Sequence, residues 1–174
     1  KDVYSKLTAI EEKYGNDKPF LVKMIALDFK GKDSVIADSQ NGLFRFHKKG
    51  TIENIDSFQG IPIYPGHAGF FESFQKRIGN TVKSFVDDKG NPSVYSYINP
   101  HDAAGSLRED LRIAEAQGQL NTFELSATGD PIEYEVIDDR KHKDFGKVDV
   151  DVKTWRAESL DFVNKGAVSG SQLD

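Results

Sequence analysis

Hydrophobic and polar residues alternate with a period of two along much of the chain, a pattern typical of β-strands with one buried face. In residues 33–50 two alternating runs flank the turn signal Gln40-Asn41-Gly42, and in residues 80–99 two more flank a polar tip. Both segments therefore predict β-hairpins. Further strands are predicted in segments 19–29, 61–69, 121–126, 131–138, 146–155 and 158–164. Residues 51–60 predict a loop.

Helical spacing of apolar residues occurs twice. Near the N-terminus apolar residues recur every three or four positions up to Gly15, which predicts a helix over residues 1–16. Residues 100–120 predict a longer helix that Gly118 can end. The apolar side of this helix consists of Ala104, Leu107, Leu111 and Ala114.

These elements lack the strict β-α alternation of a parallel sheet. Most of the strands are short, and many are joined by hairpin-like connections. We therefore expect an α+β fold, a mainly antiparallel and barrel-like sheet with a few helices around it. No domain boundary is visible, and residues 1–174 are predicted to form a single domain.

The stretch "NTFELSATGD" (residues 121–130) raises a chemical question. Phe123 and Leu125 share one face of the predicted strand, and Ser126 lies on the other face. Ser126 is expected to be the last strand residue, before a loop of small residues. A serine at the rim of a sheet either only marks the end of the strand or acts as a nucleophile. This stretch alone leaves both interpretations open.

Composition and charge narrow the class of function. The chain has 28 acidic and 23 basic residues and a net charge of −5, so no nucleic-acid partner is indicated. No apolar run is long enough for a membrane-spanning helix. The absence of cysteine excludes thiol catalysis and thiolate metal sites. No other metal motif, P-loop or dinucleotide fingerprint is present, so no metal or cofactor is expected.

Among the four histidines, His67 differs in its surroundings. His47 lies at a strand end beside two lysines, His101 approaches a helix start, and His142 lies in a charged loop where a solvated side chain is expected. His67 lies in "YPGHAG", a tight turn with little charge nearby, where small neighbours allow close approach of other segments or of a substrate. A structural role for His67 and a catalytic one both remain open.

The segment "AESLDFVN" (residues 157–164) supplies candidate acids. Alternation puts Glu158 on the apolar, inward face of a strand and Asp161 on the other face. An ionised carboxylate on an inward face is costly unless it is paired, and a histidine is the natural partner. Alternatively, Glu158 begins the strand in water, and Asp161 takes the role of the acid.

The order of these pieces resembles the prohead serine proteases of tailed double-stranded DNA phages, distant relatives of the herpesvirus assemblins. In that family a histidine precedes an "IG-V" strand and a glycine-turned hairpin, which correspond here to His67, Ile78-Gly79 and Lys89-Gly90. A helix, matched by residues 103–117, then leads to a strand with the nucleophilic serine, matched by Ser126. An acidic residue at the start of a later strand, matched by Glu158, follows. The resemblance covers roughly residues 20–170.

The resemblance implies an assemblin-like fold and a serine endopeptidase with Ser126 as nucleophile, His67 as general base and Glu158 as orienting acid, or Asp161 in its place. A serine hydroxyl needs an adjacent base to take its proton as it attacks. A histidine can be that base, because it titrates near neutral pH. The implied substrates are phage scaffolding and major capsid proteins, and the chain itself. The implied location is the interior of the prohead in the bacterial cytoplasm. Association into a homo-oligomer is compatible with this location. The polar tail "SGSQLD" suits a domain trimmed from a longer precursor.

Two other classes of function compete with this one. An ADP-ribosyltransferase-like toxin would use Arg45, Ser93 or Ser96, and the Glu133-x-Glu135 pair, which occur in that family's order. A non-enzymatic capsid-assembly or binding module on the same fold would keep Ser126 and His67 apart.

Overall fold

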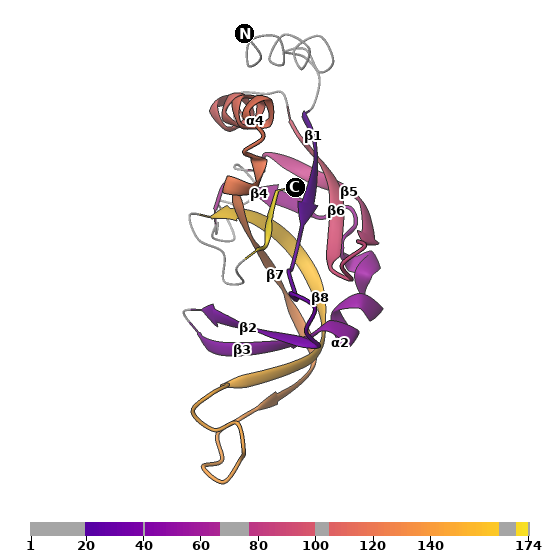
Figure 1. The fold of residues 1–174 in the computed structure, drawn as a ribbon. Helices are drawn as coiled ribbons and strands as arrows, with labels where there is room; N and C mark the ends of the chain where they lie inside the picture. The colour runs from indigo at the N-terminus through magenta and orange to yellow at the C-terminus, as the bar shows by residue number, and fades with distance from the viewer. Residues whose placement is uncertain (1–19, 40, 67–76, 100–104, 164–169, 174) are drawn as a thin grey trace.

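The computed structural model of the chain describes residues 20–39, 41–66, 77–99, 105–163 and 170–173 (Figure 1). Its strands are β1 (Phe20–Ile25), β2 (Ser34–Ser39), β3 (Gly42–His47), β4 (Pro62–Tyr64), β5 (Gly79–Val86), β6 (Pro92–Ile98), β7 (Glu124–Val136), β8 (Val150–Val163) and β9 (Gln172–Leu173). They form one sheet in the order β2-β3-β8-β4-β5-β6-β1-β9-β7, and β7 also pairs with β8.

The second pairing of β8 closes seven strands, from β8 through β4, β5, β6, β1 and β9 to β7, into a barrel. Most neighbours are antiparallel, and the parallel pairs among the described strands are β3 with β8 and β4 with β8. The barrel-like, mainly antiparallel sheet that the sequence predicts is therefore confirmed. Beyond the barrel, β7 and β8 continue as a ribbon beside the β2–β3 hairpin (Figure 1).

Several predicted elements are confirmed. The hairpins β2–β3 and β5–β6 have the expected antiparallel pairing. Helix α4 (Gly105–Gln117) ends before Gly118, whose φ of +70° suits a glycine after a helix end. This helix lies at the end of the barrel opposite the projecting β7–β8 ribbon (Figure 1). The predicted helix over 1–16 lies outside the described residues.

The prediction of a loop over residues 51–60 is wrong. The segment contains most of α2 (Lys48–Glu53) and the 3₁₀-helix η1 (Ile55–Phe58). Tertiary contacts explain the difference, because the indole N–H of Trp155 donates to the Thr51 hydroxyl at 2.8 Å. The Phe58 ring packs edge-on against the same indole, with centroids 5.4 Å apart. Helices as short as α2 and η1 are held by packing against the core more than by their own propensity.

The strands around Ser126 are also longer than predicted. β7 runs without a break from Glu124 to Val136, so Ser126 is the third residue of a 13-residue strand and not its end. The predicted strands 146–155 and 158–164 likewise merge into β8. Gly129, part of an expected turn, lies against Arg156 and the Trp155 ring, where a side chain would not fit. The long β7–β8 pairing therefore overrides the local turn signals.

The hydrophobic core lies inside the barrel and continues toward the β2–β3 hairpin. Its largest fully buried side chains are Phe20, Phe29, Phe58, Met24, Ile63, Ile78, Ile98, Leu111, Leu125, Leu160, Leu173 and Val94. Trp155 links the barrel to the hairpin, because its ring lies 5.1 Å from that of Phe46. Leu111 shows that α4 buries its apolar side against this core.

We predict that Gly50→Ala in α2 destabilises the fold by about 3 kcal/mol, because a side chain there would collide with the backbone carbonyl of Lys153. Gly31→Ala is the matched control. Gly31 has a φ of +73° but no heavy atom within 4 Å of an added Cβ, so its cost is about 1 kcal/mol of backbone strain. Urea denaturation measures both values. Equal losses would show that α2 does not pack tightly on β8.

Candidate active site

The barrel wall formed by β4, β8 and β7 brings together three segments that are far apart in the sequence. On one side of β8, Ser126 of β7 lies directly opposite Asp161. On the other side, Tyr64 at the end of β4 is aligned with the same Asp161. Opposed residues of an antiparallel pair project to the same face with Cβ atoms about 5 Å apart. The side chains of Ser126 and Asp161 therefore project to the same face from opposed positions.

These two side chains project from the outer face of the wall. Their sequence neighbours Leu125 and Leu160, with Ile63 of β4, are fully buried members of the core and so face the interior. Successive strand residues point to opposite faces, which places Ser126 and Asp161 outside the barrel. Asp161 is nevertheless only 2% exposed, and Ser126 is half-buried. A carboxylate in this setting needs hydrogen-bond donors.

One donor to Asp161 comes from its own strand. The Ser159 hydroxyl donates to Asp161 Oδ1 at 3.1 Å, and it also forms a short hydrogen bond with the Thr128 hydroxyl. Thr128 lies opposite Ser159, just as Ser126 lies opposite Asp161. Since Ser159 gives its proton to the carboxylate, Thr128 is the donor in the short contact. The outer wall therefore carries a chain of hydroxyls that ends at Asp161.

Glu158 lies in a different environment from the one that alternation predicts. Thr128 pairs with Ser159 and Gly129 pairs with Ala157, which leaves Glu158 as the extra residue of a β-bulge. The bulge interrupts the alternation, and Glu158 is exposed rather than inward-facing. The prediction of an inward Glu158 is therefore wrong. Asp161, the alternative acid, is the one that lies opposite Ser126.

The partner of Glu158 is another carboxyl group. A hydrogen bond with Asp130 raises the pKa of Glu158 above its usual value, and desolvation and the negative charge of Asp130 raise it further. Arg156 opposes this shift. A carboxyl with this environment holds its proton more tightly in the folded protein than in the unfolded chain.

His67 lies outside the described residues, but the chain that leads to it is described. β4 ends at Tyr64, and Gly66 follows with a φ of +126°. A Cβ added to Gly66 would lie 3.9 Å from the carbonyl oxygen of Phe162, the residue after Asp161. The residue before His67 is therefore next to β8, on the side away from Ser126.

A small cavity of about 30 Å³ is lined in part by Ser126. Its lining consists of Leu27, Ala37, Phe46, Leu125, Ser126, Ala127, Trp155 and Ser171. Most of these residues belong to the core, so the cavity is a packing space between the barrel and the β2–β3 hairpin. It has room for about one water molecule, and we assign no substrate to it.

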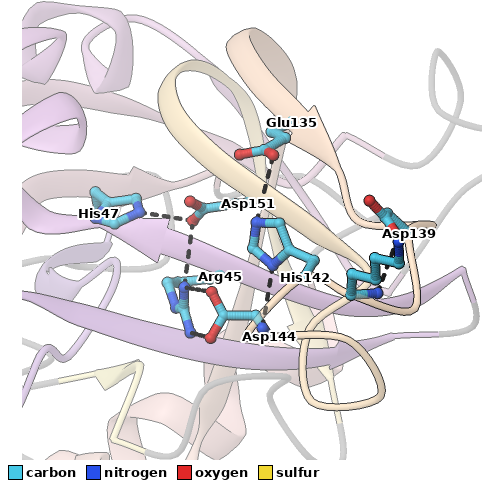
Figure 2. A network of polar contacts seen from close by, with 8 residues as sticks. Arg45, His47, Glu135, Asp139, His142, Asp144 and Asp151 are labelled. Carbon is cyan, nitrogen blue, oxygen red and sulfur yellow. Dashed lines mark hydrogen bonds and ion pairs between the residues drawn. The ribbon is translucent and has the colours of Figure 1, made fainter.

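A second polar cluster lies on the projecting ribbon (Figure 2). The Arg45 guanidinium of β3 donates to both carboxylate oxygens of Asp144, at 3.0 and 3.3 Å. This hydrogen bonding raises the pKa of Arg45 and holds the pKa of Asp144 below its usual range. Asp151 of β8 lies 3.9 Å from the same guanidinium and 2.6 Å from His47 Nε2. The cluster fastens the β7–β8 loop to β3.

His142 completes this cluster. Its Nδ1 accepts a hydrogen bond from the Asp144 backbone N–H at 3.0 Å, so the proton of the neutral ring is on Nε2, which lies 3.4 Å from Glu135 Oε1. The ring is partly buried, whereas the sequence predicts a solvated histidine. His47, expected at an exposed strand end, is instead held by Asp151. The sequence around each histidine does not reveal its carboxylate partner. Asp151 is distant from His47 in the sequence, and Glu135 lies across a loop from His142.

The structure also describes the residues that an ADP-ribosyltransferase would use. Arg45 is engaged with Asp144, and Ser93 and Ser96 are buried in β6. Glu133 and Glu135 are exposed on the ribbon half of β7, which is separated from β6 in the sheet by β1 and β9.

No protein-family model, curated protein or solved structure matches this chain. Within the described ranges, no three histidine or carboxylate side chains converge as metal ligands. No helix in the described part of the chain has the length and apolar character needed to cross a membrane.

We predict that Glu158→Gln makes the protein more stable at pH 7 and leaves its stability unchanged below about pH 4. The folded-state pKa of Glu158 is raised, so the stability due to its proton is present below the unfolded pKa and is lost as the pH rises through the folded pKa. The glutamine variant avoids that loss. Urea denaturation across this pH range measures the difference.

The control for this experiment is Glu133→Gln, which removes another exposed carboxyl from the same ribbon. It removes one negative charge but keeps the interaction of Asp130 with Glu158, so an equal gain of stability in this variant would assign the effect to net charge. Asp130→Asn should act like Glu158→Gln, and the two changes should not add, because they remove one shared interaction. Additive effects would contradict the pairing of Asp130 with Glu158.

Proposed function

We propose that this chain is a serine endopeptidase in which Ser126 is the nucleophile, His67 the general base and Asp161 the orienting acid. The observation that carries the proposal is the register of β8, which aligns Asp161 with Ser126 on one side and with the end of β4 on the other. The sequence selects the same three segments on independent grounds. His67 follows the end of β4 by three residues.

The proposed chemistry follows from these positions. The Ser126 hydroxyl is a weak nucleophile and transfers its proton to the imidazole as it attacks a peptide carbonyl. His67 then delivers that proton to the leaving amine. Asp161 fixes the imidazole tautomer and stabilises the imidazolium. Because Ser126 and Asp161 are on paired strands of a closed barrel, their separation is rigid, as a preorganised site requires.

Asp161 takes the role of the acid in place of Glu158 for two reasons. It lies opposite the nucleophile on the neighbouring strand, whereas Glu158 is exposed at the bulge and is paired with Asp130. The buried Asp161 also accepts a hydrogen bond from Ser159, which keeps its carboxylate in place. A fixed, desolvated carboxylate orients an imidazole better than a solvated one.

The finer part of the proposal concerns the biological substrate. The resemblance to prohead proteases suggests that the chain processes phage scaffolding and major capsid proteins, and itself, inside the assembling head. A closed barrel in which β4, β8 and β7 are adjacent supports an assemblin-like fold.

We predict that Ser126→Ala lowers peptide-bond hydrolysis by about 10⁴-fold or more, because the attacking hydroxyl is lost. The assay follows, by mass spectrometry, new termini in a peptide library that the purified chain digests. Ser39→Ala is the control, since it removes an exposed hydroxyl at the end of β2, outside the wall. This control should keep the full activity. Unchanged cleavage by Ser126→Ala, or an equal loss with Ser39→Ala, would contradict the proposal.

The proposed role of Asp161 as the acid of the catalytic triad is tested in the same assay. Asp161→Asn should lower the rate by about 10⁴-fold, as expected when the imidazole loses its orienting acid. Glu158→Gln should digest the library at close to the wild-type rate. The opposite pattern would return the role to Glu158.

A further inference from the structure

The outer edge of β7 is open along the half of the strand that projects beyond the barrel. β7 pairs with β8 along its length, but on its other side it pairs with β9 only at Glu124. In the part of the chain that the structure describes, no strand lies against the outer edge of residues 130–136. Figure 1 shows this half of β7 running with β8 away from the barrel. Such an edge presents backbone N–H and C=O groups that can pair with another strand.

Exposed apolar side chains gather on this open half-strand. Ile132, Tyr134 and Val136 are 54%, 57% and 56% exposed. Tyr134 and Val136 share one face, whereas Ile132 lies at a register irregularity between Pro131 and Glu133. Tyr134 lies opposite Val152 and Val136 opposite Val150, and both valines continue into phenylalanines of β3. Two apolar rows therefore cross the sheet and end at the open edge. An added strand would extend them.

The acidic residues of this half-strand add negative charge at the open edge. Residues 126–136 contain Asp130, Glu133 and Glu135 and no lysine, arginine or histidine. All three acids are exposed. On β8, Arg156 lies directly opposite Asp130, whereas Glu135 lies opposite Asp151 and 3.4 Å from His142. Directly opposed side chains share a face, so a residue paired with Glu133 or Glu135 would meet a carboxylate.

We propose that the open edge Ile132–Val136 binds an extended peptide in which lysine or arginine alternates with apolar residues. The basic side chains lie beside Glu133 and Glu135, and the apolar ones lie beside Tyr134 and Val136. Pro131 has no backbone N–H, so the pairing begins at Ile132. This binding does not depend on Ser126 being a nucleophile.

A second copy of the chain does not fit the same edge. Pairing of two β7 edges that keeps the apolar faces together would set glutamates against glutamates, which is unfavourable. The acids and Pro131 thus act against self-association, as charged and proline residues commonly do on edge strands. A basic, amphipathic strand is the occupant that matches both faces.

The test measures fluorescence anisotropy of the fluorescein-labelled peptides GSVKVKVGS and GSVEVEVGS with the Ser126→Ala chain. This variant prevents cleavage if the peptidase proposal holds, and it leaves the edge intact. We expect the lysine peptide to bind at least about tenfold more tightly than the glutamate peptide. The double variant Glu133→Lys/Glu135→Lys should reverse this preference, and both positions are exposed, so the fold is expected to tolerate the change.

A lysine peptide with N-methyl groups on alternate amides separates strand pairing from general charge attraction. It keeps its charges but cannot donate backbone hydrogen bonds on the blocked edge, so its binding should be lost. Full binding of the methylated peptide, an unchanged preference in the double variant, or no binding of GSVKVKVGS at about 1 mM would overturn the proposal. Both proposals together predict that Ser126→Ala loses peptidase activity but still binds GSVKVKVGS. Failure of one assay therefore contradicts only the proposal that the assay tests.

Discussion

The pairing of β8 with three other strands is the constraint on which the rest of the structure depends. β8 joins β7 along 14 residues, takes β4 as a parallel neighbour near its end, and takes β3 near its beginning. A shift of one residue in the β7–β8 register would exchange the inner and outer faces of the wall. The core residue Leu160 would then face outward and Asp161 inward. Burial of the core therefore also fixes the candidate site.

The site combines a rigid wall with a desolvated acid. Burial of Asp161 is unfavourable unless donors compensate for the lost water, and Ser159 provides one of them. The bulge at Glu158 has a complementary effect, because it absorbs one residue and lets both Ala157 and Leu160 face the core. Local irregularity in β8 thus separates a solvated carboxyl from a buried one within four residues.

Much of the fold could be predicted from the sequence, because alternation and turn residues mark the hairpins and the apolar spacing marks α4. The rest depends on contacts between distant segments. Helix α2 is held by Trp155, more than a hundred positions away, and β7 continues past Gly129 because β8 pairs with it. Ser126 and Asp161 could be selected as candidates from their segments. Only the register shows that they are opposite each other, and no local signal marks the bulge at Glu158.

The polar cluster and the open β7 edge extend this organisation along the ribbon. Arg45 and its carboxylates fasten the β7–β8 loop to β3 (Figure 2), which keeps the projecting strand extended. The central claim, however, concerns the barrel wall. Its most direct test is a crystal structure of the chain after reaction with diisopropyl fluorophosphate. The account predicts phosphorus on Ser126 Oγ and the His67 imidazole between that atom and Asp161. An adduct on another residue, or an imidazole that reaches neither side chain, would contradict it.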